Sequence, residues 1–149
     1  MNNFVYSIED LDINELFSFL NEVDSDITLF YPISQRVNIF EYSKKLKNNA
    51  THFCARNDNK LVGLISVYLN DFTSKIGYVT LVHVNIDYRK YGIASTLLEK
   101  VLIEARNKGF EYIDLEVYKK NEIAISLYEK KRFLIKKEQK DSYIMRLVL

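Results

Sequence analysis

The sequence has little of several residue types, and each scarcity excludes a class of protein. A single cysteine, Cys54, stands among 149 residues, so we expect neither an internal disulfide nor a cysteine-rich zinc site. The 21 basic and 20 acidic side chains nearly cancel, which leaves no broad positive field to attract nucleic acid or an anionic membrane. No apolar run approaches about 18 residues, and the first residues lack the pattern of a signal peptide. We expect a soluble, cytoplasmic protein.

Proline and glycine are scarce as well, with one and four residues, and no flexible linker divides the chain. We therefore expect one domain over residues 1–149. Apolar residues recur at the spacings of strands and helices in the order β-α-α-β-β-β-α-β-α-β-β. This order predicts an α/β (α+β) domain with a mixed, mostly antiparallel sheet of about seven strands and four helices. The predicted strands lie at 4–8, 51–56, 61–69, 76–84, 112–118, 133–137 and 142–148, and the predicted helices at about 13–23, 35–47, 94–105 and 121–131.

The turn between the predicted strand 76–84 and the next helix is the first functional signal. A turn that enters a helix leaves backbone N–H groups unpaired at the positive end of the helix dipole, where phosphate oxygens can bind. Gly92 and Ala94 keep this turn small enough for close approach. A Walker loop is excluded, because no Gly-x-x-x-x-Gly-Lys occurs. Spacing alone leaves an ordinary turn equally open. The basic and hydroxyl residues that would assist phosphate binding are Arg89, Lys90, Ser95 and Thr96.

The segment Arg89-x-x-Gly92-x-Ala94 resembles the acyl-CoA signature of the GCN5-related N-acetyltransferase (GNAT) family, Arg/Gln-x-x-Gly-x-Gly/Ala. Two further stretches stand where that family has its bulged fourth strand and its fifth strand, Val82-His83-Val84 and Leu115-Glu116-Val117. The next helix and its exit match the family pattern Asn-x-x-Ala-x-x-Leu-Tyr-x-x-x-x-Phe at Asn121, Ala124, Leu127, Tyr128 and Phe133. Within the family, the core most resembles the bacterial ribosomal-protein alanine N-acetyltransferases. One departure is Lys131-Arg132, which replaces the usual glycine before Phe133.

The resemblance implies the GNAT fold and acetyl-CoA as cosubstrate. In this family the fourth and fifth strands splay apart, and the pantetheine arm of CoA enters between them like an extra strand. Backbone groups of Val82 and Val84 would then pair with the arm, and the amides from Lys90 through Ser95 would hold the diphosphate. The implied cofactor-binding residues are Val82, His83, Val84, Arg89, Lys90, Tyr91, Gly92, Ile93, Ala94, Ser95, Thr96 and Asn121.

Acetyl transfer from a thioester to an amine needs a neutral amine, a donor for the developing oxyanion and help for the departing thiolate. The resemblance assigns the oxyanion to the Val84 N–H and the sulfur to the Tyr128 hydroxyl. A Tyr pKa of about 10 against a thiol pKa of about 8.5 makes full proton transfer cost about 2 kcal/mol. We therefore expect Tyr128 to donate a hydrogen bond first and its proton late. Glu116 is the candidate base, directly or through water. His83 alternates with Val82 and Val84, so we expect it to face the other side of the sheet.

The residues alone leave simpler interpretations open. Periodicity favours a core position for Tyr128, a strand residue such as Glu116 is often solvated, and Asn121 is a suitable helix cap. A non-catalytic acyl-CoA-binding regulatory or interaction module is the alternative function, and a nucleotide-binding domain without CoA chemistry is a weaker one.

The predicted acceptor is the primary amine of a small molecule, such as an amino sugar or amino acid, which attacks directly in a ternary complex. In this family the first two helices and the last hairpin line the acceptor groove. The final turn here is short and lacks the long insertion of the ribosomal-protein enzymes, so a protein N-terminus is the less favoured acceptor. We predict no metal and no nucleic-acid or membrane partner, and a homodimer stays open. The residues that would face the acceptor are Phe30, Tyr31, Gln35, Arg36 and Tyr42.

Overall fold

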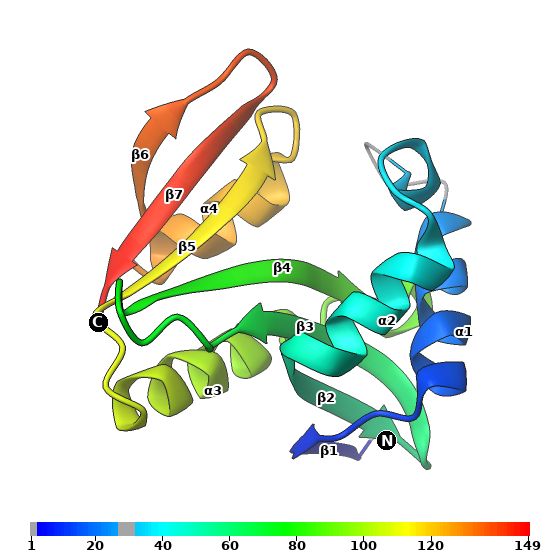
Figure 1. Ribbon diagram of the computed structural model, residues 1–149. Coiled ribbons are helices and arrows are strands. Elements are labelled where there is room, and N and C mark those ends of the chain that lie inside the picture. The colour runs from blue at the N-terminus through cyan, green and yellow to red at the C-terminus, as the bar shows by residue number, and fades with distance from the viewer. Residues whose placement is uncertain (1–2, 27–31) are drawn as a thin grey trace.

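The computed structural model describes residues 3–26 and 32–149, which form a mixed seven-stranded sheet with helices on both faces (Figure 1). The strand order is β1-β2-β3-β4-β5-β7-β6. The predicted fold class and element order are confirmed. The strands are β1 (Phe4–Glu9), β2 (Thr51–Asn57), β3 (Lys60–Tyr68), β4 (Ile76–Val84), β5 (Tyr112–Tyr118), β6 (Leu134–Glu138) and β7 (Ser142–Val148). The helices are α1 (Ile13–Asp24), α2 (Ile39–Asn49), α3 (Ile93–Asn107) and α4 (Glu122–Lys130), with short 3-10 turns η1 (Ile33–Gln35) and η2 (Ile86–Tyr88).

The sheet consists of two antiparallel parts that meet at one short parallel junction. Strands β1 to β4 pair antiparallel in sequence, apart from the helices inserted between β1 and β2. Strand β7 pairs antiparallel with both β5 and β6. The two parts join where residues 76–79 of β4 pair in parallel with residues 112–115 of β5. Beyond these residues β4 and β5 diverge, which Figure 1 shows as a V.

Each face of the sheet carries its own hydrophobic core. On one face, α1 and α2 bury Leu16, Leu20 and Leu46 against Leu64 of β3. On the opposite face, α3 and α4 pack against the neighbouring residues of the same strands in a second core. Strand β3 is consequently buried on both faces over most of its length, as its long, mostly apolar run predicts.

Side-chain caps decide where the first two helices begin. The Asp12 carboxylate accepts a 2.8 Å hydrogen bond from the Asn14 N–H, which fixes the start of α1. The Asn38 side chain accepts a 3.0 Å hydrogen bond from the Glu41 N–H and so caps α2. The prediction that this second helix begins near Gln35 is therefore wrong, because residues 33–35 form the separate turn η1.

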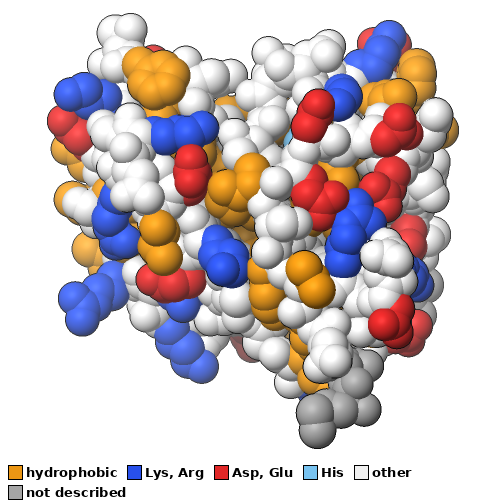
Figure 2. Space-filling model, turned by 90° about the horizontal axis from the view of Figure 1, so that it is seen from below, with side chains coloured by type: hydrophobic (Ala, Val, Ile, Leu, Met, Phe, Trp, Pro, Cys, Tyr) orange, Lys and Arg blue, Asp and Glu red, His pale blue; other side chains and the backbone are white. Residues whose placement is uncertain are grey.

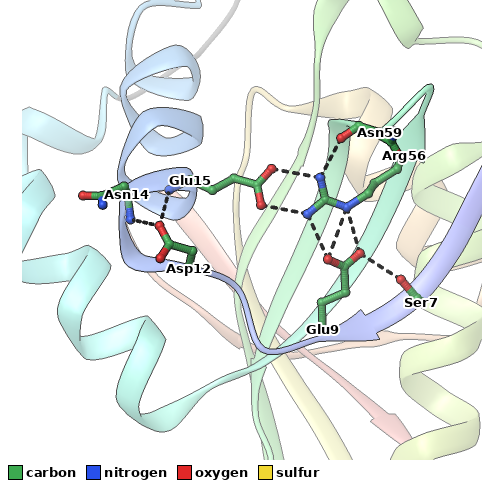
Figure 3. A network of polar contacts seen from close by, with 7 residues as sticks. All are labelled: Ser7, Glu9, Asp12, Asn14, Glu15, Arg56 and Asn59. Atoms are coloured by element: carbon green, nitrogen blue, oxygen red, sulfur yellow. Dashed lines mark hydrogen bonds and ion pairs between the residues drawn. The ribbon is translucent and has the colours of Figure 1, made fainter.

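An arginine joins β1, β2 and the start of α1 (Figure 3). Arg56 of β2 donates to both carboxylate oxygens of Glu9 at 2.9–3.2 Å and to those of Glu15 at 2.8 Å. Its guanidinium also donates to the Asn59 carbonyl at 2.9 Å. Since all three side chains are partly shielded from water, this network fixes the edge strand β1 and the first turn of α1 more firmly than an exposed ion pair would.

The close packing of α3 on the sheet depends on one glycine. A Cβ on Gly63 of β3 would lie 2.8 Å from Ile93 Cγ2, at the first residue of α3. The absence of that carbon lets the N-terminal end of the helix rest directly on β3. This contact sets the height of the preceding turn, residues 85–92, above the sheet.

Candidate active site

The divergence of β4 and β5 leaves a cavity of about 130 Å³ between the two strands. We call it the β4–β5 opening. Its lining includes side chains from both faces of the sheet, since Leu81 belongs to the core under α1 and α2, and Val79 and Tyr128 belong to the core under α3 and α4. A bulge in β4 lies at its edge, where Ser66 and Val67 of β3 face Leu81 and Val79 and leave Thr80 unpaired. The lining residues are Val79, Thr80, Leu81, Val82, Leu115, Glu116, Val117, Tyr118, Asn121 and Tyr128.

Tyr128 stands at the α4 side of this opening. Its side chain is 6% exposed, and its ring packs 5.7 Å from that of Phe133. Burial raises the pKa of Tyr128 to about 12, so its hydroxyl keeps its proton at neutral pH. The hydroxyl donates to no other residue in the described ranges. The residue is thus both the core aromatic that its periodicity predicts and a protonated donor beside the opening.

The helix exit after Tyr128 keeps its turn although the usual glycine is missing. Arg132 adopts φ 74°, the left-handed conformation that glycine favours. The Phe133 N–H donates to the Tyr128 carbonyl at 3.0 Å, and this closes the end of α4. The departure from the family pattern therefore changes the residue and leaves the backbone path intact.

The turn before α3 presents a row of unpaired amides. The N–H groups of residues 90–95 donate to no described residue, and the first hydrogen bond back to Gly92 comes from the Thr96 N–H at 3.0 Å. Lys90 and Gly92 adopt φ 71° and 76°, and a Cβ on Gly92 would meet no atom within 4 Å. Alternating positive and negative φ turns successive N–H groups toward a common point, which suits an anion. We call residues 90–95 the amide turn.

The side chains of the amide turn differ in what they can reach. Ile93 is buried in the core under α3, so only its backbone is free for a ligand. Tyr91 is exposed, and its ring contacts that of Phe4 with centroids 5.6 Å apart. Lys90 is exposed, whereas Ala94, Ser95 and Thr96 are partly buried.

Arg89, directly before the amide turn, points away from it. Its Nε donates to the Val84 carbonyl at 3.0 Å, and its guanidinium pairs with Asp26 at 2.5 Å. Asp26 is only 6% exposed. The arginine therefore ties the end of β4 to the chain after α1, and its charge is already partly neutralised there.

His83 faces the α1 side of the sheet, as the alternation of β4 predicts. Its Nε2 lies 3.7 Å from Asp26 Oδ2, and its ring packs against Phe19 at 5.9 Å. The side chains of Val82 and Val84 pack instead toward the α3 core. Burial lowers the pKa of His83 to about 4, with a further lowering from the Arg89 charge that outweighs the opposing effect of Asp26. A neutral imidazole at physiological pH is the consequence.

Glu116 and Asn121 stand on the β5 side of the opening. The Glu116 carboxylate is exposed, and its Oε2 accepts a 2.6 Å hydrogen bond from Ser142 Oγ. Asn121 caps α4, because its side chain accepts from the Ala124 N–H at 3.2 Å. The predicted cap is confirmed, and the remaining amide group of Asn121 borders the opening.

The predicted acceptor side is only partly described. Phe30 and Tyr31 lie outside the described residues. Tyr42 of α2 contacts the β4 bulge, since its hydroxyl lies 2.8 Å from Thr80 Oγ1 and 3.1 Å from the Thr80 carbonyl. Sequence reasoning missed Thr80, because the extra residue of a bulge is visible only in the strand register.

The surface seen from the α3 side mixes charges of both signs (Figure 2). Lys and Arg side chains alternate there with Asp and Glu, and no broad area of one sign is visible. Among residues 3–26 and 32–149, no group of three or more His, Cys, Asp or Glu side chains could hold a metal ion. No helix in those same ranges is long and apolar enough to cross a membrane.

Comparison with known proteins agrees with this geometry. The sequence model of the acetyltransferase (GNAT) family matches residues 12–133, which include the amide turn and Tyr128. A GNAT acetyltransferase from Streptococcus pneumoniae superposes with a TM-score of 0.81 at 22% identity, covering 99% of both chains.

Two further solved structures have the same fold. The PaiA N-acetyltransferase from Thermoplasma acidophilum, crystallised with coenzyme A, gives a TM-score of 0.76 at 18% identity and covers 97% of this chain and 99% of that one. The ribosomal-protein-S18-alanine N-acetyltransferase from Escherichia coli gives 0.77 at 19% identity, covering 97% of this chain and 94% of that one. At such low identity these likenesses show the fold alone.

Proposed function

Because the chain belongs to the GNAT family of acetyltransferases and uses acetyl-CoA as its cosubstrate, we propose that it acetylates the primary amine of a small molecule by direct attack in a ternary complex. The observation that carries this proposal is the β4–β5 opening, a cavity between the two diverging strands that is bordered by the protonated Tyr128. A thioester that enters from the amide turn and an amine that arrives from the α2 side would meet there.

The amide turn fits the diphosphate of CoA. Its free N–H groups lie at the positive end of the α3 dipole, and Gly92 leaves open space above the backbone. Lys90, Ser95 and Thr96 supply further donors nearby. Arg89 supports the turn from below through its bonds to Val84 and Asp26.

The pantetheine arm would follow β4. Beyond Val79, the edge of β4 that faces β5 has no strand partner, so the backbone groups of Val82 and the N–H of Val84 are available to the arm and its thioester. The Val84 carbonyl already accepts from Arg89 Nε. His83 lies between these two valines, but its backbone groups face Leu64 of β3 and its side chain lies on the other face of the sheet. Asn121 would contact the arm from the opposite side of the opening.

The chemistry assigns one group to each charge that changes. The amine nitrogen attacks the thioester carbon, and the Val84 N–H stabilises the oxyanion that forms. The carbon–sulfur bond then breaks, and the Tyr128 hydroxyl donates to the departing sulfur. With a Tyr128 pKa of about 12 against about 8.5 for a thiol, complete proton transfer costs about 5 kcal/mol. Tyr128 therefore acts mainly as a hydrogen-bond donor. Glu116 takes the amine proton through water, since its carboxylate is exposed to solvent.

A small acceptor suits the described side of the opening. The last hairpin turn spans only a few residues, closed by the Gln139 N–H donating to the Ser142 carbonyl at 2.9 Å. Such a turn offers little surface to hold an extended peptide. Structures with this fold include protein N-acetyltransferases, so both kinds of acceptor belong in the test.

The experiment measures thiol release from acetyl-CoA with amino acids, amino sugars, simple amines and peptides that begin with alanine. Calorimetry with CoA on the same protein reports cofactor binding independently. We expect CoA binding together with acetylation of at least one small amine. Binding without transfer to any acceptor would favour the non-catalytic module, and transfer to peptides alone would overturn the small-molecule assignment.

A further inference from the structure

A buried serine lies against the candidate base. Ser142, the first residue of β7, is 4% exposed, and its Oγ donates a 2.6 Å hydrogen bond to Glu116 Oε2. Glu116 is itself exposed and borders the β4–β5 opening. Its other carboxylate oxygen, Oε1, accepts from no residue in the described ranges. The protein therefore fixes one oxygen of this carboxylate and leaves the other for water or a ligand.

The hairpin of β6 and β7 sets the position of this serine. Ser142 pairs with Tyr118 of β5, two residues after Glu116, and residues two apart on a strand face the same side of the sheet. The Gln139 N–H donates to the Ser142 carbonyl at 2.9 Å and closes the turn. In Figure 1 this turn lies beside the tip of β5. The short turn thus brings Gln139 and Ser142 together next to Glu116.

The Ser142 hydroxyl has two acceptors for one proton. Its Oγ lies 2.6 Å from Glu116 Oε2 and 2.9 Å from Gln139 Oε1, and a hydroxyl can donate to only one of them at a time. While Glu116 is ionised, its charge attracts the donor. Once Glu116 is protonated, its O–H can donate to Ser142 Oγ, and the serine proton turns to Gln139. Ser142 therefore has a hydrogen bond for both protonation states of the base.

Ser142 is neutral, whereas the neighbouring carboxylate on β5 is held by cations. Asp114, two residues before Glu116, pairs with Arg146 at 2.7 Å and with Lys136 at 3.5 Å. A cation at such a distance favours the ionised carboxylate and so opposes the uptake of a proton. Glu116 forms no ion pair with a described residue. The serine therefore fixes the Glu116 carboxylate and leaves it able to accept a proton.

From this arrangement we infer that Ser142 is a positioning residue for acetyl transfer, which holds Glu116 at the opening while it is ionised and turns to Gln139 when Glu116 takes up the amine proton. The inference rests on the proposed function, in which this proton reaches Glu116 through water. Glu116 then releases it to solvent, and Ser142 keeps its own proton throughout. Without the serine, the exposed side chain of Glu116 would occupy several rotamers, and only some of them would reach that water.

The test is a double-mutant cycle between the serine and the base. kcat and KM are measured by thiol release, with the fastest small amine of the acceptor panel, for wild type, Ser142→Ala, Glu116→Gln and the double variant. Gln139→Leu removes the second acceptor. Ser43→Ala is the matched control, because Ser43 is also buried and its Oγ makes one hydrogen bond, to the Ile39 carbonyl of its own helix at 2.8 Å. CoA calorimetry and a thermal melt accompany each variant.

We expect Ser142→Ala to lower kcat about tenfold, as the loss of a hydrogen bond to a charged group requires, with CoA affinity and both KM values near wild type. Its Tm should fall no further than that of Ser43→Ala, which should keep the wild-type kcat. In the Glu116→Gln background, Ser142→Ala should change kcat by less than about twofold. Gln139→Leu should lower kcat less than Ser142→Ala does and should add nothing to it.

A wild-type kcat in Ser142→Ala, or an equal fall in both backgrounds, would overturn the inference and leave the proposed function standing. A wild-type kcat in Gln139→Leu would overturn the part assigned to that side chain. Wild-type activity in Glu116→Gln would overturn the inference as well, because no base at this position would then need to be held. If CoA binds and the wild type acetylates no acceptor of any class, the proposed function fails and this inference with it.

Discussion

The amide turn permits a sharp test, because α3 has a glycine of the same conformation at each end. Gly92 precedes the helix with φ 76°, and Gly109 follows it with φ 84°. A Cβ at either position would meet no atom within 4 Å. The substitutions Gly92→Ala and Gly109→Ala therefore impose the same backbone strain without a clash, and they differ in only one respect. Gly92 belongs to the row of free amides.

The strain of placing alanine in the left-handed region is about 1 kcal/mol in either variant. For a domain of this size, that corresponds to a Tm lower by about 3 °C. At Gly92 the strained backbone also relaxes toward negative φ, which turns neighbouring N–H groups away from the diphosphate. Loss of one hydrogen bond to a charged oxygen costs about 1.5–3 kcal/mol. The Kd for CoA should therefore rise about tenfold or more.

Calorimetric titration with CoA and a thermal melt of each variant complete the comparison. We expect equal losses of Tm, weakened CoA binding in Gly92→Ala and unchanged binding in Gly109→Ala. A CoA affinity that stays at the wild-type value in Gly92→Ala would refute the assignment of the diphosphate to the amide turn. Equal weakening in both would attribute the effect to helix stability.

Three further predictions concern single side chains. Tyr128→Phe should lower kcat about tenfold or more with CoA affinity unchanged. The control Tyr6→Phe on β1 should leave both kcat and CoA affinity near wild type. A Tyr128→Phe kcat within about twofold of wild type would exclude the hydroxyl from catalysis. The His83 pKa is about 4 in the folded protein and about 6.5 in the unfolded chain, so between these pH values only the unfolded state takes up a proton. The free energy of unfolding, measured by urea titration, should therefore fall by about 2.5 kcal/mol more in wild type than in His83→Gln between pH 7 and pH 4.5. Equal falls in the two proteins would contradict the buried neutral ring. Arg56→Ala should lower the free energy of unfolding by about 2 kcal/mol, because the carboxylates of Glu9 and Glu15 lose their shared partner. The control Lys44→Ala breaks the exposed ion pair with Glu41 and should cost less than about 0.5 kcal/mol in the same denaturation assay.

The elements of this fold were predictable because their signals are local. Long β-rich, mostly apolar runs predicted the covered strands, and alternation along β4 predicted that His83 faces away from Val82 and Val84. The helix spacing around Tyr128 predicted its burial, and Asn121 was recognised as a cap. Each of these conclusions needs only the residues within about one turn or one strand of the position.

The parts that sequence reasoning missed depend on contacts between distant segments. Arg89 carries the family signature, yet its guanidinium is bound to Asp26, which lies 63 residues earlier. The resemblance implied a bulged fourth strand, but the position of the bulge at Thr80 is defined only by the register of β4 against β3, so nothing in the sequence of β4 marks it. The start of α2 was misplaced because the cap at Asn38 competes with a short turn that has similar spacing. Tertiary contacts decided all three.

The most direct test of the central claim is the position of the CoA sulfur in a crystal structure of the protein with CoA and an acceptor amine. The account predicts diphosphate oxygens within hydrogen-bond distance of the amides of residues 90–95, the pantetheine arm between β4 and β5, and the sulfur beside the Tyr128 hydroxyl. A coenzyme bound outside the β4–β5 opening, or a sulfur out of reach of Tyr128 with the amine in place, would contradict it.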